Sequence, residues 1–142
     1  MPGGETLYLF VPARTLWSVA QADCADDSSP SITHLVEFTD ADEVRAVQAG
    51  APFPSPWEAW TGYARDTGSN PYTFFATTGP LLPLDSTAWA GMEPDGSTIA
   101  GEETVTFFGH NFYIADAPPT FANLAICECD GRLVTETFRV LP

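Results

Sequence analysis

The feature that most constrains this chain is the placement of its three cysteines, with Cys24 near the start and Cys127 and Cys129 near the end. Three thiols cannot all pair within one chain, so one is left over. A disulfide from Cys24 to the Cys127–Cys129 region would close a loop of about 100 residues and contribute roughly 4–5 kcal/mol in the chain-entropy model. The sequence therefore predicts a domain whose two ends are tied together, and such a bond favours an oxidising compartment.

A first helix is expected to carry Cys24 into the core. Leu16, Val19, Ala20 and Cys24 recur at the spacing of one helical face. Thr15 precedes them and is expected to be the N-cap.

The rest of the chain predicts a second helix and several short strands. Thr39 is expected to cap a helix from Asp40 to about Ala49, with Gly50 as C-cap. The expected strands cover residues 7–11, 34–38, 60–63, 104–108, 112–114 and 124–128. Residues 65–101 read as a long loop, and residues 133–141 as an extra edge strand or a linker. This order predicts an α+β fold with an antiparallel sheet.

The net charge of the chain limits the classes of partner that it can bind. It has 19 acidic residues against five arginines and no lysine, a formal net charge of −14 at pH 7. Such a chain repels nucleic-acid phosphates and anionic membranes and suits neutral or cationic partners. Solubility or adaptation to salt would explain the same charge. No apolar run reaches the roughly 20 residues that cross a bilayer, and residues 1–4 show no features of a signal peptide.

Five short motifs follow one another in an order that is typical of one family. They are Thr15-Leu16-Trp17-x-x-Ala20-x-x-x-Cys24, His34-Leu35-Val36, Trp60-Thr61-Gly62-Tyr63, Glu93-Pro94-Asp95 and Ala125-Ile126-Cys127-Glu128. The ordered set resembles the C-type lectin-like domain family. The resemblance implies an α+β fold in which two helices pack on small antiparallel sheets with a long irregular loop. The domain would span residues 5–130, with residues 131–142 as an extra strand or linker.

The resemblance also implies a disulfide between Cys24 and Cys127. Cys129 departs from the family pattern, and on a strand it lies on the same face as Cys127, so it could compete for Cys24. It would otherwise be a free thiol or a link to another chain. The family's second disulfide has no counterpart, since Thr104 and Pro119 fall at its positions. The loop would then be held by a metal ion or by the pair Pro118-Pro119.

A Ca²⁺ site is implied at Glu93, Asp95, Glu102 and Asp116, which resemble the long-loop ligands of sugar-binding members. Ca²⁺ takes six to eight oxygen ligands, and carboxylates supply them. Pro94 would, by the same resemblance, follow a cis bond.

Two departures weaken the sugar-binding pattern at this site. Ala115 stands where an amide ligand is expected, and the loop motif has acids on both sides of Pro94. Two carboxylates accept hydrogen bonds but donate none. These residues therefore favour metal binding over recognition of mannose or galactose.

Several aromatic residues and His34 are expected to have structural rather than ligand-binding roles. Trp89, Phe107 and Tyr113 are expected in the core, although the aromatics of residues 89–121 would form a binding platform if exposed. His34 is expected to be a structural residue and His110 to lie in solvent.

The sequence predicts a non-enzymatic binding module, secreted or on the cell surface. Its ligand would be a glycan bound with the help of one Ca²⁺. Alternatives are Ca²⁺-independent protein interaction or adhesion, and sequence-variable recognition. An enzyme is the weakest hypothesis, because no acid/base pair or nucleophile stands out.

Overall fold

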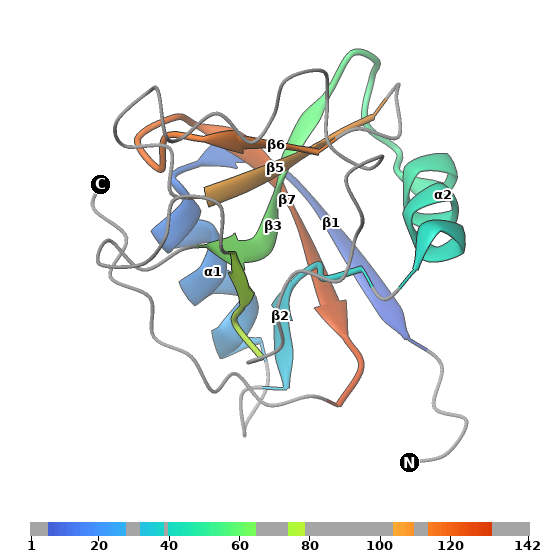
Figure 1. The fold of residues 1–142 in the computed structure, drawn as a ribbon, viewed down its shortest axis with the longest axis horizontal. Helices are drawn as coiled ribbons and strands as arrows, with labels where there is room; N and C mark the ends of the chain where they lie inside the picture. The colour runs from blue at the N-terminus through green and yellow to red at the C-terminus, as the bar shows by residue number, and fades with distance from the viewer. Residues whose placement is uncertain are drawn as a thin grey trace.

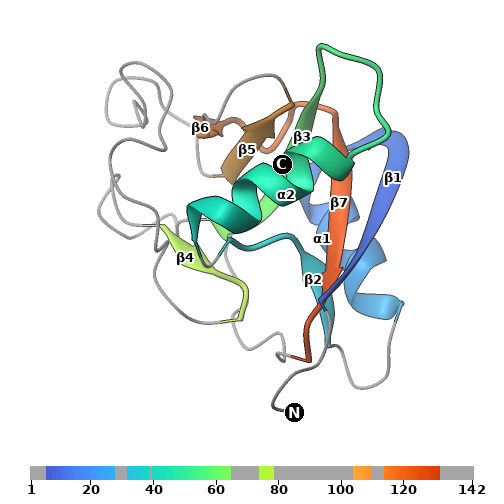
Figure 2. The ribbon, with the colours of Figure 1, turned by 90° about the vertical axis from the view of Figure 1, so that its right-hand side faces the viewer.

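The computed structural model describes residues 6–27, 32–38, 40–64, 74–78, 104–109 and 114–131. Two helices lie on opposite sides of one sheet (Figures 1 and 2). In chain order the elements are β1 (Leu7–Thr15), α1 (Trp17–Asp26), β2 (Thr33–Leu35), α2 (Ala41–Gly50), β3 (Glu58–Ala64), β4 (Phe75–Ala76), β5 (Thr104–Phe108), β6 (Ile114–Ala117) and β7 (Asn123–Cys129). The predicted α+β class is confirmed. No helix within the described ranges is long and apolar enough to cross a membrane.

The sheet is mixed rather than purely antiparallel. Its strands run in the order β1-β7-β3-β5-β6, while β2 also pairs with β7 and β4 with β3. The pairing of β3 with β7 is parallel, with Ala59 opposite Leu124 and Trp60 opposite Ala125. The expectation of an antiparallel sheet fails here because a long connection separates these two strands, so no hairpin fixes their direction.

Helix α1 begins one residue later than expected. Thr15 is the last residue of β1, and its carbonyl oxygen accepts a hydrogen bond of 2.8 Å from Trp60 Nε1. Leu16 occupies the N-cap position without a side-chain cap. The prediction of Thr15 as the N-cap was therefore wrong, because pairing in the sheet extends β1 up to the helix.

The buried face of α1 is rotated from the predicted one. Trp17, Ala20 and Cys24 are buried, whereas Val19 is 51% exposed. Trp17 also donates a hydrogen bond of 2.9 Å from Nε1 to the carbonyl oxygen of Thr61 in β3. The indole thus has both an apolar contact surface and a polar partner, which fixes the helix on this face.

Helix α2 is capped by Asp40, not by Thr39. The Asp40 carboxylate accepts a hydrogen bond of 2.9 Å from the Glu43 amide, as a favourable N-cap does. Thr39 lies outside the described residues. Gly50 is the last helical residue and Ala51 the C-cap, so the predicted end is one residue short.

The strand predictions differ mostly at their ends. Strand β5 has the expected bounds, while β1, β3 and β7 are longer and β2 is shorter. Strand β6 covers residues 114–117, and of the predicted residues 112–114 only Ile114 is described. Strand β4 falls inside the expected long loop. Residues 132–142, which hold the predicted extra strand, are outside the described part.

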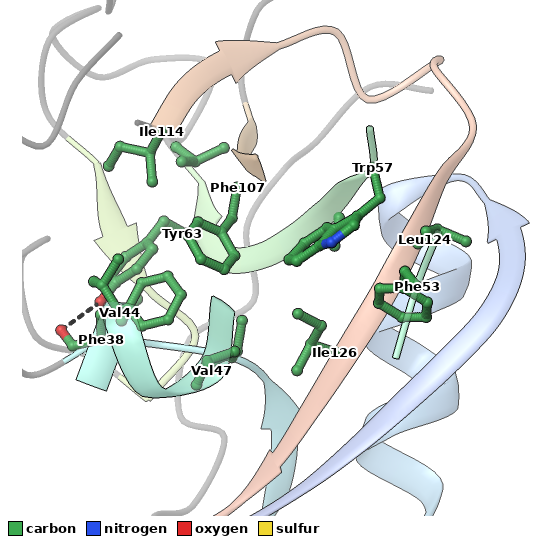
Figure 3. Packing of buried hydrophobic residues seen from close by; sticks show 14 of the residues in the cluster. Phe38, Val44, Val47, Phe53, Trp57, Tyr63, Phe107, Ile114, Leu124 and Ile126 are labelled. Atoms are coloured by element: carbon green, nitrogen blue, oxygen red, sulfur yellow. Dashed lines mark hydrogen bonds between the residues drawn. The ribbon is translucent and has the colours of Figure 1, made fainter. Parts of the chain in front are cut away.

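Each side of the sheet has its own core. The core on the α2 side, here the aromatic core, includes Phe38, Val47, Trp57, Tyr63, Phe107 and Ile126 (Figure 3). The core on the α1 side, here the disulfide core, contains Trp17, Ala20, Cys24, Leu35, Trp60, Ala64, Ala117, Ala125 and Cys127. Phe107 is fully buried, as predicted.

The disulfide between Cys24 and Cys127 is present. It joins α1 to β7 across 103 residues, with 5.4 Å between the two Cα atoms. Cys129 is a free, half-buried thiol. The cross-link therefore ties the first helix to the last strand, as the resemblance implied.

Candidate functional site

Asp116 is the one predicted calcium ligand within the described residues. It lies on β6 opposite Val105 of β5 and is 4% exposed. Since directly opposed residues share a face, Asp116 lies on the same side as Val105, and Ile114, two residues earlier on β6, shares that side. The carboxylate thus belongs to the rim of the aromatic core. Glu93, Asp95 and Glu102 lie outside the described residues, as do Pro94, Trp89, His110 and Tyr113.

The neighbouring Ala115 lies on the opposite face of β6. It pairs with Thr106 and is 8% exposed. The Thr106 hydroxyl donates a hydrogen bond of 3.4 Å to the Ala115 carbonyl oxygen. A side chain without oxygen is therefore enclosed next to the proposed ligand.

A hydrogen bond joins β5 to β6 near the two positions that correspond to the family's second disulfide. Thr104 is fully buried, and its hydroxyl donates a bond of 2.7 Å to the carbonyl oxygen of Ala117, with which it pairs. Pro119 follows two residues later and is buried. Polar pairing between β5 and β6 thus fixes the strand ends that flank Asp116.

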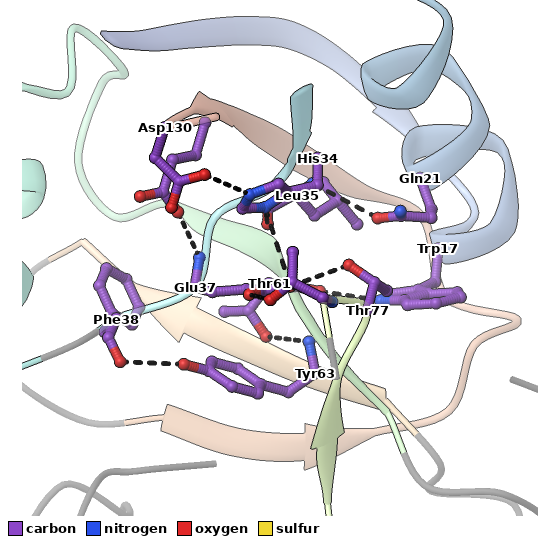
Figure 4. Close-up of polar contacts among 12 residues, drawn as sticks. Trp17, Gln21, His34, Leu35, Glu37, Phe38, Thr61, Tyr63, Thr77 and Asp130 are labelled. Atoms are coloured by element: carbon purple, nitrogen blue, oxygen red, sulfur yellow. Dashed lines mark hydrogen bonds and ion pairs between the residues drawn. The ribbon is translucent and has the colours of Figure 1, made fainter. Parts of the chain in front are cut away.

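A second polar group surrounds His34 on β2, beside the last residues of β7 (Figure 4). His34 is fully buried, as is expected of a structural histidine. Its Nδ1 lies 2.8 Å from the Leu35 carbonyl oxygen and its Nε2 lies 3.1 Å from Asp130 Oδ1. Glu37 Oε1 is 3.8 Å from Nδ1. The contacts with Leu35 and Asp130 are hydrogen bonds when the ring nitrogen carries the hydrogen, because both partners are acceptors.

Glu37 connects this group to the turn after β4. Its carboxylate accepts hydrogen bonds from the Thr77 hydroxyl at 2.9 Å, the Thr78 amide at 3.2 Å and the Thr78 hydroxyl. Its own amide donates to Glu128 Oε2 at 2.9 Å. A Cβ on Gly62 would lie 2.6 Å from the Leu35 carbonyl oxygen and 2.8 Å from Glu37 Cγ, so only glycine fits beside this carboxylate.

Tyr8 extends the group to α2. Its hydroxyl donates a hydrogen bond of 2.6 Å to Glu43, and it lies opposite Glu128 in the pairing of β1 with β7. Burial raises the pKa of Tyr8 far above its ordinary value of 10, helped by the hydrogen bond to Glu43 and by the charges of Glu128, Glu43 and Asp130. Tyr8 is therefore a neutral donor among carboxylates.

Three of these side chains could offer ligands to a metal ion. One atom from each of His34, Glu128 and Asp130 lies within 4.8 Å of the others. One nitrogen and two carboxylates suit Zn²⁺ or Mn²⁺ better than Ca²⁺, which prefers oxygen. Both nitrogens of His34 already contact oxygen atoms, so an ion would have to displace the Asp130 contact. The arrangement is a polar network that joins β1, β2 and β7.

Sequence reasoning identified His34 but missed its partners. Glu37 and Glu128 lie among apolar residues in the segments Leu35–Phe38 and Ile126–Cys129, and both are 1% exposed. An acid inside an apolar run is the signal that could have located them, because a buried carboxylate requires hydrogen-bond donors.

Solved structures with the same fold are found in several animals. The C-type lectin CEL-I from Cucumaria echinata superposes with a TM-score of 0.77 at 21% identity, over 91% of this chain and 93% of that one. The carbohydrate-recognition domain of the mouse scavenger receptor C-type lectin gives 0.73 at 19% identity, over 92% and 93%. A calcium-independent type II antifreeze protein gives 0.72 at 15%, over 89% and 87%.

Sequence comparison alone finds no relative. No family model matches the chain, and no curated protein matches it. The fold nevertheless superposes on the solved structures along nearly their whole length. The chain folds as a C-type lectin-like domain.

Proposed function

We propose that this domain is a non-enzymatic binding module that recognises a glycan with the help of one Ca²⁺. Glu93, Asp95, Glu102 and Asp116 would hold the ion. The observation that carries this proposal is Asp116, a carboxylate only 4% exposed on β6. Carboxylate oxygens are the ligands that Ca²⁺ prefers, and a buried carboxylate is held in a fixed position by its partners. A C-type lectin carbohydrate-recognition domain is among the structures with this fold.

Chain connectivity supports Glu102 as a second ligand. Thr104 pairs with Ala117, the residue after Asp116. Glu102 precedes Thr104 by two residues, and two residues of chain span at most about 7 Å. A carboxylate at position 102 can therefore reach the neighbourhood of Asp116. Glu93 and Asp95 enter the proposal through the resemblance of the Glu-Pro-Asp motif alone.

The second candidate function is Ca²⁺-independent binding of a protein partner. Ala115 supplies no side-chain oxygen where a ligand is expected, and its side chain is enclosed. A calcium-independent antifreeze protein shares the fold, so the fold itself does not require the ion. The disulfide supports placement of either kind of module outside the cytosol, on the cell surface or in secreted form.

Thermal unfolding with Ca²⁺ and with EDTA tests the metal. Ca²⁺ at 100 times its Kd should add about 2.7 kcal/mol to the free energy of unfolding. For a domain of this size the melting temperature should rise by roughly 5–10 °C. The rise should disappear in Asp116→Asn and Asp95→Ala. It should persist in Asp23→Asn, which removes an exposed charge on α1 and serves as the control.

A panel of neutral glycans, with and without EDTA, tests the ligand. Glycan binding that EDTA and Asp95→Ala abolish would support the proposal. Glycan binding that ignores both would refute the calcium-assisted site. Absence of a calcium-induced shift together with binding to a protein partner would favour the second candidate function.

A further inference from the structure

Two cysteines of β7 open into one cavity at the end of α1. Side chains alternate along a strand, so Cys127 and Cys129 point to the same side of the sheet. They pair with Leu9 and Leu7 of β1, respectively. Both line a cavity of about 260 Å³ whose wall also includes Asp27, the C-cap of α1. The free thiol and the disulfide therefore share a space.

The last turn of α1 carries unfavourable charge. Asp23, Asp26 and Asp27 lie at this end, and no basic residue does. Acidic side chains are unfavourable at a helix C-terminus, where the carbonyl groups already place negative charge. The Asp27 amide donates a long hydrogen bond of 3.4 Å to the Cys24 carbonyl oxygen. Cys24 thus belongs to a turn whose charge and terminal hydrogen bond both favour fraying.

We propose that Cys129 is an internal exchange partner of the disulfide between Cys24 and Cys127. The Cys129 thiolate attacks Cys24 Sγ and forms a bond between these two sulfur atoms. The bond between Cys24 and Cys127 breaks, and its electron pair leaves on Cys127 Sγ, which takes up the proton that Cys129 lost. The step is a redox-neutral isomerisation and needs no oxidant.

The rest of the fold should tolerate the isomer that has a bond between Cys24 and Cys129. The loop closed by Cys24 and Cys129 is only two residues longer than the present one, so its entropic contribution is almost unchanged. The Cys127 thiol would remain in the disulfide core, where cysteine behaves as a small apolar side chain. The change is concentrated in the last turn of α1, which must unwind for Cys24 to reach Cys129. The domain thereby has a thiol-controlled switch at the cavity between α1 and β1.

Disulfide mapping of two single variants tests the exchange. After non-reducing digestion and mass spectrometry, folded Cys127→Ser should contain a bond between Cys24 and Cys129 and no free thiol. The matched variant Cys129→Ser should contain only the bond between Cys24 and Cys127. Two free thiols in folded Cys127→Ser would overturn the proposal.

Wild-type protein gives an answer even if Cys127→Ser does not fold. The protein is first incubated at mildly alkaline pH without an alkylating agent, so that the Cys129 thiol stays free to exchange. Rapid trapping with N-ethylmaleimide in denaturant should then place label on Cys127 as well as on Cys129. No label on Cys127 would overturn the exchange. Asp26→Lys places a favourable positive charge at the end of α1, and it should slow the appearance of label on Cys127 with incubation time about two- to fivefold. An unchanged rate would refute the unwinding of the helix end.

Discussion

The aromatic core and the disulfide core lie on opposite sides of one sheet and are held by different means. In the aromatic core, Phe38 and Phe107 stack edge to face at 4.9 Å, and Trp57 does so with Phe107 at 5.4 Å. In the disulfide core, six of the nine buried residues are alanine or cysteine. Small side chains bury less area. We therefore expect the aromatic core to be held mainly by packing and the disulfide core to depend more on its covalent bond.

The largest effect should come from removing that bond. The double variant Cys24→Ala/Cys127→Ala should lose about 5 kcal/mol of unfolding free energy, because the disulfide closes a loop of about 100 residues. Urea denaturation measures the loss, and Cys129→Ala is the control that removes a thiol but no cross-link. A double variant as stable as this control would show that packing alone holds α1.

On the other side, truncating one ring should cost nearly as much. Phe107→Ala removes a fully buried side chain that contacts two other rings, and about 4 kcal/mol should be lost. The matched control is Phe121→Ala, since Phe121 is 56% exposed and should change stability by less than about 0.5 kcal/mol. If the two variants were equally stable, the packing account of this side would fail.

The smallest effect concerns the polar contact between β1 and α2. Tyr8→Phe removes the hydrogen bond to Glu43 and should cost about 1–2 kcal/mol at pH 7. The raised pKa of Tyr8 adds a pH dependence with a definite sign. A tyrosine whose pKa is raised on folding contributes its full stability below the unfolded value of about 10 and loses it as the pH rises further.

Alkaline denaturation of the wild type and of Tyr8→Phe checks the direction in which stability changes with pH. Above about pH 10 the wild type should lose stability more steeply than Tyr8→Phe. Both proteins should carry Cys129→Ser, so that thiol exchange does not interfere. Parallel curves would contradict the role of Tyr8.

The disulfide could be predicted from the sequence better than the contacts of the buried polar residues. The family resemblance gave Cys24 and Cys127 as partners, and periodicity placed Cys24 and Ala20 on the buried face of α1. Val19 was misplaced because the helix turns Trp17, Ala20 and Cys24 inward, and Thr15 was misplaced as the N-cap because β1 continues through it. Local pattern cannot show how far sheet pairing extends a strand, since that depends on residues more than 100 positions away.

The candidate site was less predictable. Asp116 could be proposed from its place in a motif order, but its burial on the rim of the aromatic core follows from the register of β5 and β6. The network around His34 joins residues up to 96 positions apart in sequence. The sequence near Glu37 does not show its hydrogen-bond donors, because Thr77 and Thr78 reach it from the turn after β4.

Strand β7 has a consequence for how this protein is made. It binds β1, β2 and β3, all of which leave the ribosome earlier. Until Asn123–Cys129 has emerged, those three strands lack a common neighbour, and their backbone edges stay open to other chains. Pairing between distant parts of a chain is slow and exposes such edges to aggregation. Folding of this domain is therefore completed by its last strand, when synthesis of the described part is almost over.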